Sequence, residues 1–199
     1  MSNLLKRASF ALLLVLGLTL GGVVSAQMGG AKEEPKAEEK KEDGSKLPWS
    51  IDEVKKSMKA GSSMKIKVET DTNGTKSITW MTTEITEVSD SGYKSKETTI
   101  DEKGKQVEGT EVETYEKEWD GLYAEFLNSE AKVSEGKVKV GAGEFNCKIY
   151  ETKVEKDGAK TQMKVWFIKD KPGFLAKVEY TVEGEGMKIS SVITVEETK

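Results

Sequence analysis

The sequence predicts a mainly β protein of the α+β class, in which an antiparallel meander of strands is accompanied by two short helices. Apolar and polar residues alternate along most of the chain after Met64, which is the period of a strand with one buried face. Turn signals rich in Gly, Asp and Asn recur between these segments. Two stretches, near 51–60 and 119–128, instead carry apolar residues at helical spacing.

The first predicted helix begins at a capping box. Ser50 precedes Glu53 by three residues, so each side chain can satisfy a backbone amide at the start of a helix. Val54 and Met58 then share one face, and Gly61 ends the run. We expect this helix to pack on the sheet that follows.

The strands are expected to pair as hairpins. Met64, Ile66 and Val68 alternate with charged residues, and later segments rich in Thr and Val repeat this pattern. Turn signals between the segments predict hairpins at 71–74, 90–92, 101–104, 157–158, 171–173 and 183–186.

The second predicted helix interrupts the strands at 119–128. Leu122 and Phe126 are four residues apart, and the neighbouring Tyr123 and Leu127 lie on the same side of a helix. Asn128 or the next residue would end it. We expect its apolar stripe to cover one face of the sheet.

The last strands carry the clearest information about burial. One strand has five apolar residues on a single face, namely Phe174, Ala176, Val178, Tyr180 and Val182. By contrast, 163–168 and 189–195 are apolar on both faces. This predicts either central strands partly covered on their second face or a curved sheet whose concave side holds something.

Residues 1–26 have the three parts of a secretory signal peptide. Lys6 and Arg7 precede an uncharged run that ends in small residues, and we place cleavage after Ala26. The strongly apolar part is shorter than the roughly 20 residues of a membrane anchor. No Cys lies directly after this apolar run, so the lipid attachment of bacterial lipoproteins is not available. We expect a periplasmic or extracellular protein that does not span the membrane after cleavage.

The chain after the signal divides into two parts. Residues 27–46 mix Lys, Glu, Pro and Gly with almost nothing to bury, which predicts a disordered charged linker. A charged helix and a spacer reaching through a layer of the cell envelope are the alternatives. Residues 47–199 have the length of a single domain.

The composition excludes several kinds of chemistry. The sequence contains no His, and Arg7 is its only Arg, so the chain after Ala26 has neither. A Ser-His-Asp triad and a zinc site of the usual Cys/His type cannot be built. Removal of two basic residues with the signal changes the formal charge from −4 to −6, which disfavours nucleic acid as a partner. We predict no catalytic residue, cofactor or metal.

Cys147 is the only cysteine of the chain. Alternation places it on the same strand face as Phe145 and Ile149. We interpret it as a small buried apolar residue, with a reactive thiol or an intermolecular disulfide as alternatives.

Two segments resemble ligand loops but lack essential parts. The segment 69–74 matches the first half of a calcium-binding EF-hand loop, yet position twelve is Trp80 where a bidentate Glu is needed. The Gly-rich segment 136–143 lacks the spacing and the Lys of a phosphate-binding loop. We interpret the first as a hairpin turn and the second as a short strand and a turn.

Three stretches of the last third of the chain, 140–147 (VGAGEFNC), 163–167 (MKVWF) and 171–179 (KPGFLAKVE), resemble exported bacterial LolA-like domains. That group includes periplasmic lipoprotein carriers. The resemblance implies an unclosed, strongly curved half-barrel with helices across its concave face, which houses acyl chains in some members. A carrier of the best-known type would have functional Arg residues, and here this chain departs from it.

Three hypotheses about function follow. The first is a binding module that holds a lipid or another apolar small molecule, with aromatic groups near the cavity at Trp80, Trp166, Phe174 and Tyr180. The second is a structural or interaction protein of the cell envelope with a fully packed core, which binds an envelope protein. The third is an enzyme that uses carboxylates alone, for example on glycans.

Overall fold

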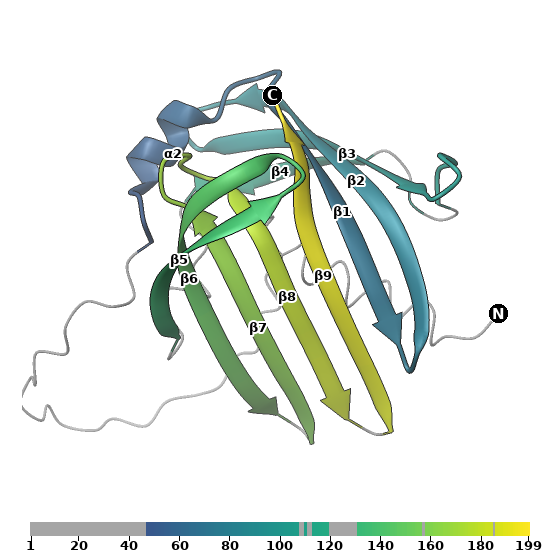
Figure 1. The fold of residues 1–199 in the computed structure, drawn as a ribbon. Coiled ribbons are helices and arrows are strands. Elements are labelled where there is room, and N and C mark those ends of the chain that lie inside the picture. Colours follow the sequence, from purple (N-terminus) through teal and green to yellow (C-terminus); the bar gives the residue numbers. More distant parts are fainter. Residues whose placement is uncertain (1–46, 108–109, 111–112, 120–130, 157, 185) are drawn as a thin grey trace, which may run out of the picture.

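The computed structural model describes residues 47–107, 110, 113–119, 131–156, 158–184 and 186–199. The predicted signal peptide and linker therefore lie outside the described residues. Within these ranges the chain forms one helix and nine strands (Figure 1). Their bounds are α2 Ile51–Ser57, β1 Ser63–Thr72, β2 Thr75–Val88, β3 Gly92–Asp101, β4 Glu113–Glu118, β5 Lys132–Val140, β6 Gly143–Lys156, β7 Ala159–Ile168, β8 Leu175–Gly184 and β9 Met187–Thr198.

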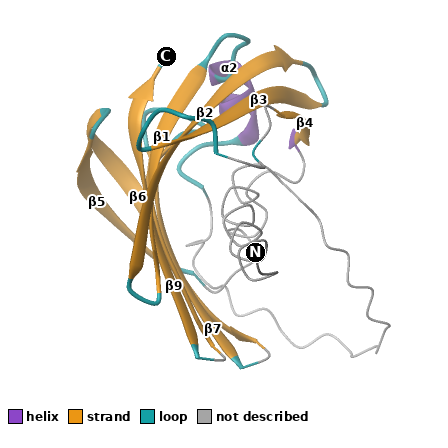
Figure 2. Ribbon diagram, turned by 90° about the vertical axis from the view of Figure 1, so that its right-hand side faces the viewer, coloured by secondary structure: helices purple, strands orange, loops and turns teal. Residues whose placement is uncertain are grey.

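All nine strands belong to one antiparallel sheet, with the order β4-β3-β2-β1-β9-β8-β7-β6-β5. The predicted antiparallel hairpins are confirmed except at 101–104, where the turn is closed by an isolated bridge between Ile100 and Gln106 and β4 begins only at Glu113. The strands also do not form one continuous meander. Two meanders, β1 to β4 and β5 to β9, are joined where β1 pairs with β9 in the middle of the sheet. The edge strands are β4 and β5, so the sheet is open, and Figure 2 shows that it is strongly curved.

Helix α2 confirms the predicted capping box. Ser50 donates its backbone N–H to Glu53 Oε2 at 2.7 Å, and Glu53 donates its own to Ser50 Oγ at 3.3 Å. The Ser50 backbone N–H, and after it the Ser50 hydroxyl, which donates to Glu53 Oε2 at 2.9 Å, lower the pKa of the Glu53 carboxyl. The helix ends earlier than expected, at Ser57, because Met58 has extended backbone geometry. The second predicted helix, 119–128, lies outside the described residues except for Trp119.

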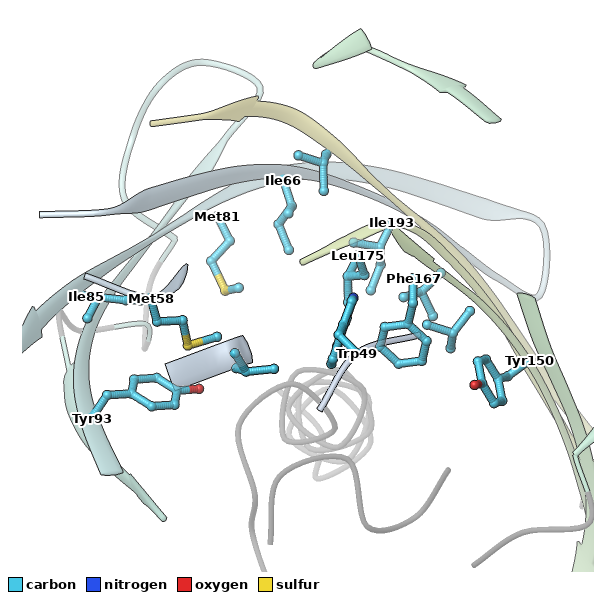
Figure 3. Close-up of a cluster of buried hydrophobic side chains, with 14 of the residues drawn as sticks. Trp49, Met58, Ile66, Met81, Ile85, Tyr93, Tyr150, Phe167, Leu175 and Ile193 are labelled. Carbon is cyan, nitrogen blue, oxygen red and sulfur yellow. The ribbon is translucent and has the colours of Figure 1, made fainter. Parts of the chain in front are cut away.

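Most of the buried side chains form one cluster, which we call the inner cluster; we call the sheet face that carries it the inner face. Figure 3 shows these side chains pointing to the inside of the arched sheet. Trp49 and two residues at α2, Val54 and Met58, belong to the cluster, so this segment packs on the inner face. Trp49 donates its indole N–H to the backbone oxygen of Ile168 at 3.0 Å and meets the Phe167 ring edge-on. The strands contribute Ile66, Val68, Met81, Ile85, Tyr93, Tyr150, Val165, Phe167, Leu175, Val178, Ile193 and Val195.

A second cluster, the outer cluster, lies on the opposite face of β6, β7 and β8. It consists of Cys147, Ile149, Trp166, Ile168 and Ala176. Figures 1 and 2 show the β5–β6 hairpin crossing the convex side of the sheet, and Val138, Val140 and Phe145 of this hairpin pack against the cluster. The Ala142 N–H at its turn donates to the Val195 backbone oxygen at 3.0 Å. Part of the second face is therefore covered, which explains why 163–168 is apolar on both sides.

The face predicted for 174–182 is wrong over its first half. A register shift between Trp166 and Phe167 pairs Phe167 with Leu175 but Trp166 with Lys177, leaving Ala176 as an extra residue in β8. A bulge of this kind reverses the alternation. Phe174 and Ala176 therefore belong to the outer cluster, whereas Val178 and Tyr180 lie at the inner one.

The β1–β2 hairpin confirms the interpretation of 69–74 as a turn. Asn73 and Gly74 both have positive φ, of 50° and 86°, between the paired residues Thr72 and Thr75. Two consecutive positive φ values match the twist of a two-residue hairpin, and Asn-Gly is the preferred sequence for it. Asn73 also accepts a hydrogen bond from the Lys188 N–H at 2.8 Å, which ties this turn to β9.

The contact between α2 and the β7–β8 turn can be tested at Gly173. This residue has a φ of +87°, and a Cβ built on it would lie 2.8 Å from Met58 Cε and 3.1 Å from Val54 Cγ1. Gly173→Ala adds left-handed strain and overpacking, so we expect it to lower the free energy of unfolding by about 2–4 kcal/mol in urea titrations. Gly104→Ala is the control, because Gly104 has a similar φ of +73° in open space. We expect this control to cost about 1 kcal/mol; equal losses would contradict the contact.

Candidate binding face of the sheet

The inner face continues beyond the inner cluster toward the strand ends that lie far from α2 (Figure 1). Cross-strand pairing there aligns Thr70 with Ser191, Ser191 with Tyr180, Tyr180 with Met163 and Met163 with Thr152. Directly opposite residues of an antiparallel sheet point to the same side. We call these five residues the inner band. Two large side chains, Tyr180 and Met163, lie at its centre, and small residues with hydroxyl groups lie on either side of them.

The inner band is only partly buried: Ser191 and Thr152 are 3% and 8% exposed, whereas the other three residues keep more exposed surface. Met163 and Tyr180 are half-buried at the margin of the inner cluster. Val154, two residues beyond Thr152 on β6, is 55% exposed. The hydroxyl groups of Thr70 and Ser191 are 3.1 Å apart and can satisfy one another, so the surface they leave is mainly apolar. Partial burial also raises the pKa of the Tyr180 hydroxyl, which stays protonated.

A group of polar residues occupies the same face on β3. Tyr93, Ser95 and Glu97 alternate with Lys94 and Lys96, and Tyr93 belongs to the inner cluster. The register confirms the placement, because Ser95 lies opposite the buried Ile85 and Glu97 lies opposite Thr83. The exposed fractions are 0% for Ser95 and 9% for Glu97. Burial and the charge of Glu97 both raise the pKa of the Tyr93 hydroxyl, so it remains a hydrogen-bond donor.

The four aromatic residues predicted near a cavity do not lie together. Trp166 is buried in the outer cluster, with the Nζ atoms of Lys164 and Lys177 at 5.1 and 5.2 Å from its ring. Phe174 packs on the same cluster. Trp80 directly precedes the buried Met81 in β2, so its side chain lies on the outer face, where it is half-buried. Tyr180 alone of the four lies on the inner face, within the inner band.

Sequence reasoning did not identify Ser95 and Glu97. Their strand reads Tyr-Lys-Ser-Lys-Glu, with polar residues on both faces, so hydrophobic alternation gives no signal. The neighbouring strand β2 carries a signal that could have identified them, because Met81 and Ile85 predict which of its faces is buried. The missing information was the pairing register of β2 with β3.

Cys147 is buried with Ile149 in the outer cluster, as predicted. Its exposed fraction is 0%, and burial, with a smaller contribution from Asp170, raises the pKa of the thiol to about 11. A hollow of about 510 Å³ lies beside it. Glu135 and Lys169, which line this hollow, pair at 2.9 Å, so their opposite charges give it no clear preference for a ligand.

Two further properties concern only the described ranges. They contain no group of three or more His, Cys, Asp or Glu residues placed to hold a metal ion. No helix within them has the length and hydropathy needed to cross a membrane.

Comparison with known proteins gives structural similarities alone. No protein-family model matches the chain, and no curated protein matches it. An exported protein with a YmcC-like fold from Bacteroides fragilis is 12% identical over 71% of this chain and 96% of that chain, with a TM-score of 0.43. A lipoprotein from Parabacteroides distasonis is 11% identical over the same shares, with a TM-score of 0.46.

A third similar structure comes from the group that the sequence resembles. It is an outer membrane lipoprotein-sorting protein domain from Vibrio parahaemolyticus, 10% identical over 75% of this chain and 90% of that chain, with a TM-score of 0.32.

Burial of Cys147 can be measured by thiol labelling. Because the thiolate is the reacting form, we expect iodoacetamide to label the native protein at least ~100-fold more slowly than the protein unfolded in urea. At a pH of about 9 most of the unfolded thiol is thiolate, whereas the native thiol, whose pKa burial raises to about 11, is still almost entirely protonated. Rapid labelling of the native protein would support the reactive-thiol alternative.

Proposed function

We propose that this protein is exported and that its inner face binds an apolar ligand such as the acyl chain of a lipid. The observation that carries the proposal is the inner band, where Met163 and Tyr180 continue the apolar inner face and remain half-buried. Contact with a hydrocarbon chain would remove this apolar surface from water, which contributes about 0.8 kcal/mol per buried CH₂ group. The periplasm or the extracellular space is the proposed place of binding.

The two faces of the sheet differ in the way that this function needs. On the outer face, away from the outer cluster, neighbouring strands carry charged residues such as Lys67 and Glu69, which pair at 3.1 Å. The inner face instead presents methyl groups, hydroxyl groups and a thioether at the inner band. Apolar lining with a few polar groups is typical of small-molecule sites.

The alternative, an envelope protein with a fully packed core, is supported by the packing at the other end of the inner face. There Trp49, Phe167 and Tyr150 pack edge to face, with ring centroids 5.6 and 5.5 Å apart. This packing stabilises one end of the sheet and leaves the inner band at the opposite end. The binding hypothesis therefore accounts for more of the inner face.

Carboxylate-only hydrolysis is less compatible with the inner face. Such an enzyme needs two carboxyl groups flanking the reacting bond. Among the residues whose burial is described, Glu97 is the one buried acidic side chain. The geometry thus supports binding better than hydrolysis.

The proposal predicts uptake of an uncharged apolar probe. We expect N-phenyl-1-naphthylamine to gain fluorescence with the protein purified without detergent, and native mass spectrometry to detect a co-purified lipid. Met163→Lys should weaken probe binding at least ~10-fold, because it places a charge within the apolar inner band. Absence of both probe binding and co-purified lipid would overturn the proposal.

Gln162→Lys is the matched control. Gln162 is the exposed neighbour of Met163 in β7 and points to the outer face, so the same charge is added where no ligand contact is proposed. We expect this variant to bind the probe like the unaltered protein. Equal losses in the two variants, with unchanged circular dichroism, would place the probe away from the inner band.

A further inference from the structure

We propose that Asn73, at the tip of the β1–β2 hairpin, is a site of N-linked glycosylation that receives its glycan from a lipid-linked oligosaccharide. This inference rests on export, which is one part of the proposed function, because N-linked glycans of this kind are transferred to exported chains. It is independent of apolar binding. Asn73 lies in the turn beyond the last cross-strand pair, Thr72 with Thr75.

The acceptor sequence is Asn73-Gly74-Thr75. It has the form Asn-x-Ser/Thr, with a residue other than Pro in the middle, that marks N-glycosylation acceptors in exported proteins. No other Asn of the sequence has Ser or Thr two positions after it. Asp71 also places an acidic residue two positions before Asn73, as in the longer acceptor sequence of bacterial oligosaccharyltransferases. A motif of this kind requires an accessible surface turn.

The hairpin tip meets this requirement. Asn73, Gly74 and Thr75 are all exposed. A Cβ built on Gly74 would meet no described atom within 4 Å. Figure 1 shows the β1–β2 turn at the strand ends far from α2. A glycan on Asn73 would therefore extend from the tip without displacing the described parts of the fold.

Hydrogen bonds orient the Asn73 carboxamide. Its Oδ1 accepts the Lys188 N–H at 2.8 Å, and the Asn73 backbone N–H donates to the Lys188 oxygen at 3.0 Å. Because a backbone N–H can pair only with the oxygen of a carboxamide, Nδ2 is the branch directed away from this contact. Asp71 Oδ1 accepts the Gly74 N–H at 2.7 Å and stabilises the turn. Nδ2 is the atom that takes the sugar, so the modified residue would keep both hydrogen bonds to Lys188.

The transfer exchanges one bond for another without oxidation or reduction. A bond forms between Asn73 Nδ2 and C1 of the first sugar, while the bond from C1 to the lipid pyrophosphate oxygen breaks. The lipid pyrophosphate leaves with the electron pair, and one Nδ2 proton goes to a base. The product is still an amide, so its Oδ1 remains a hydrogen-bond acceptor.

The test uses the full chain purified from the cell that exports it. Trypsin cuts after Lys67 and Lys76 and releases 68–76, which contains Asn73. We expect mass spectrometry to find one oligosaccharide on this peptide. Thr75→Ala should abolish the modification, although Asn73 and the turn residues remain. Thr75→Ser is the matched control and should keep it, because Ser also completes the acceptor sequence.

The N-terminus of the same sample separates the possible failures. A chain that begins at Gln27 but has an unmodified 68–76 peptide would overturn the glycosylation and leave export and apolar binding intact. Retention of residues 1–26 would overturn export and the glycan with it. Equal modification of the Thr75→Ala and Thr75→Ser variants would overturn the assigned acceptor sequence. Binding of N-phenyl-1-naphthylamine tests the inner face separately.

Discussion

The pairing of β1 with β9 is the interaction on which the rest of the structure depends. It joins the two meanders, and Thr70 and Ser191, which meet across it, are 121 residues apart in the chain. Closing so long a loop costs entropy before any contact is gained. Buried pairs such as Ile66 with Val195 and Val68 with Ile193 offset this cost. A one-residue slip would turn their apolar side chains to the outer face, so the same pairs also determine the register.

In this arrangement the two faces of the sheet are covered by different segments of the chain. Segment 47–58 packs on one end of the inner face, and the β5–β6 hairpin packs on part of the outer face. At the position between them, β7 has buried residues on both sides, with Phe167 inside and Trp166 outside. The sheet is consequently packed on both faces at this end. The opposite end of the inner face is held by strand pairing, and among the described residues Met163 and Tyr180 remain half-buried there.

Local features of the fold were predictable from the sequence because they depend on residues close together in the chain. The Ser50–Glu53 capping box, the Asn73–Gly74 turn and the burial of Cys147 each follow from a few neighbours and from alternation. The β1–β9 pairing was not predictable in this way, because no local pattern specifies which distant strand completes a sheet. The extra residue at Ala176 also escaped prediction, since a bulge leaves no signal in a strand that is apolar on both faces.

The candidate site likewise has one part that was predictable from the sequence and another that was not. Tyr180 could be placed on the inner face from alternation along β8, but Trp80, Trp166 and Phe174 were grouped with it only because they are aromatic. Aromatic side chains contribute a large buried area wherever they pack, so their identity does not reveal a face. Glu97 is informative for the opposite reason: a carboxylate gains nothing from burial by itself, and its presence beside an apolar cluster requires a compensating positive or hydrogen-bonding group. The few polar positions of an apolar face therefore carry more information about their surroundings than its many apolar ones.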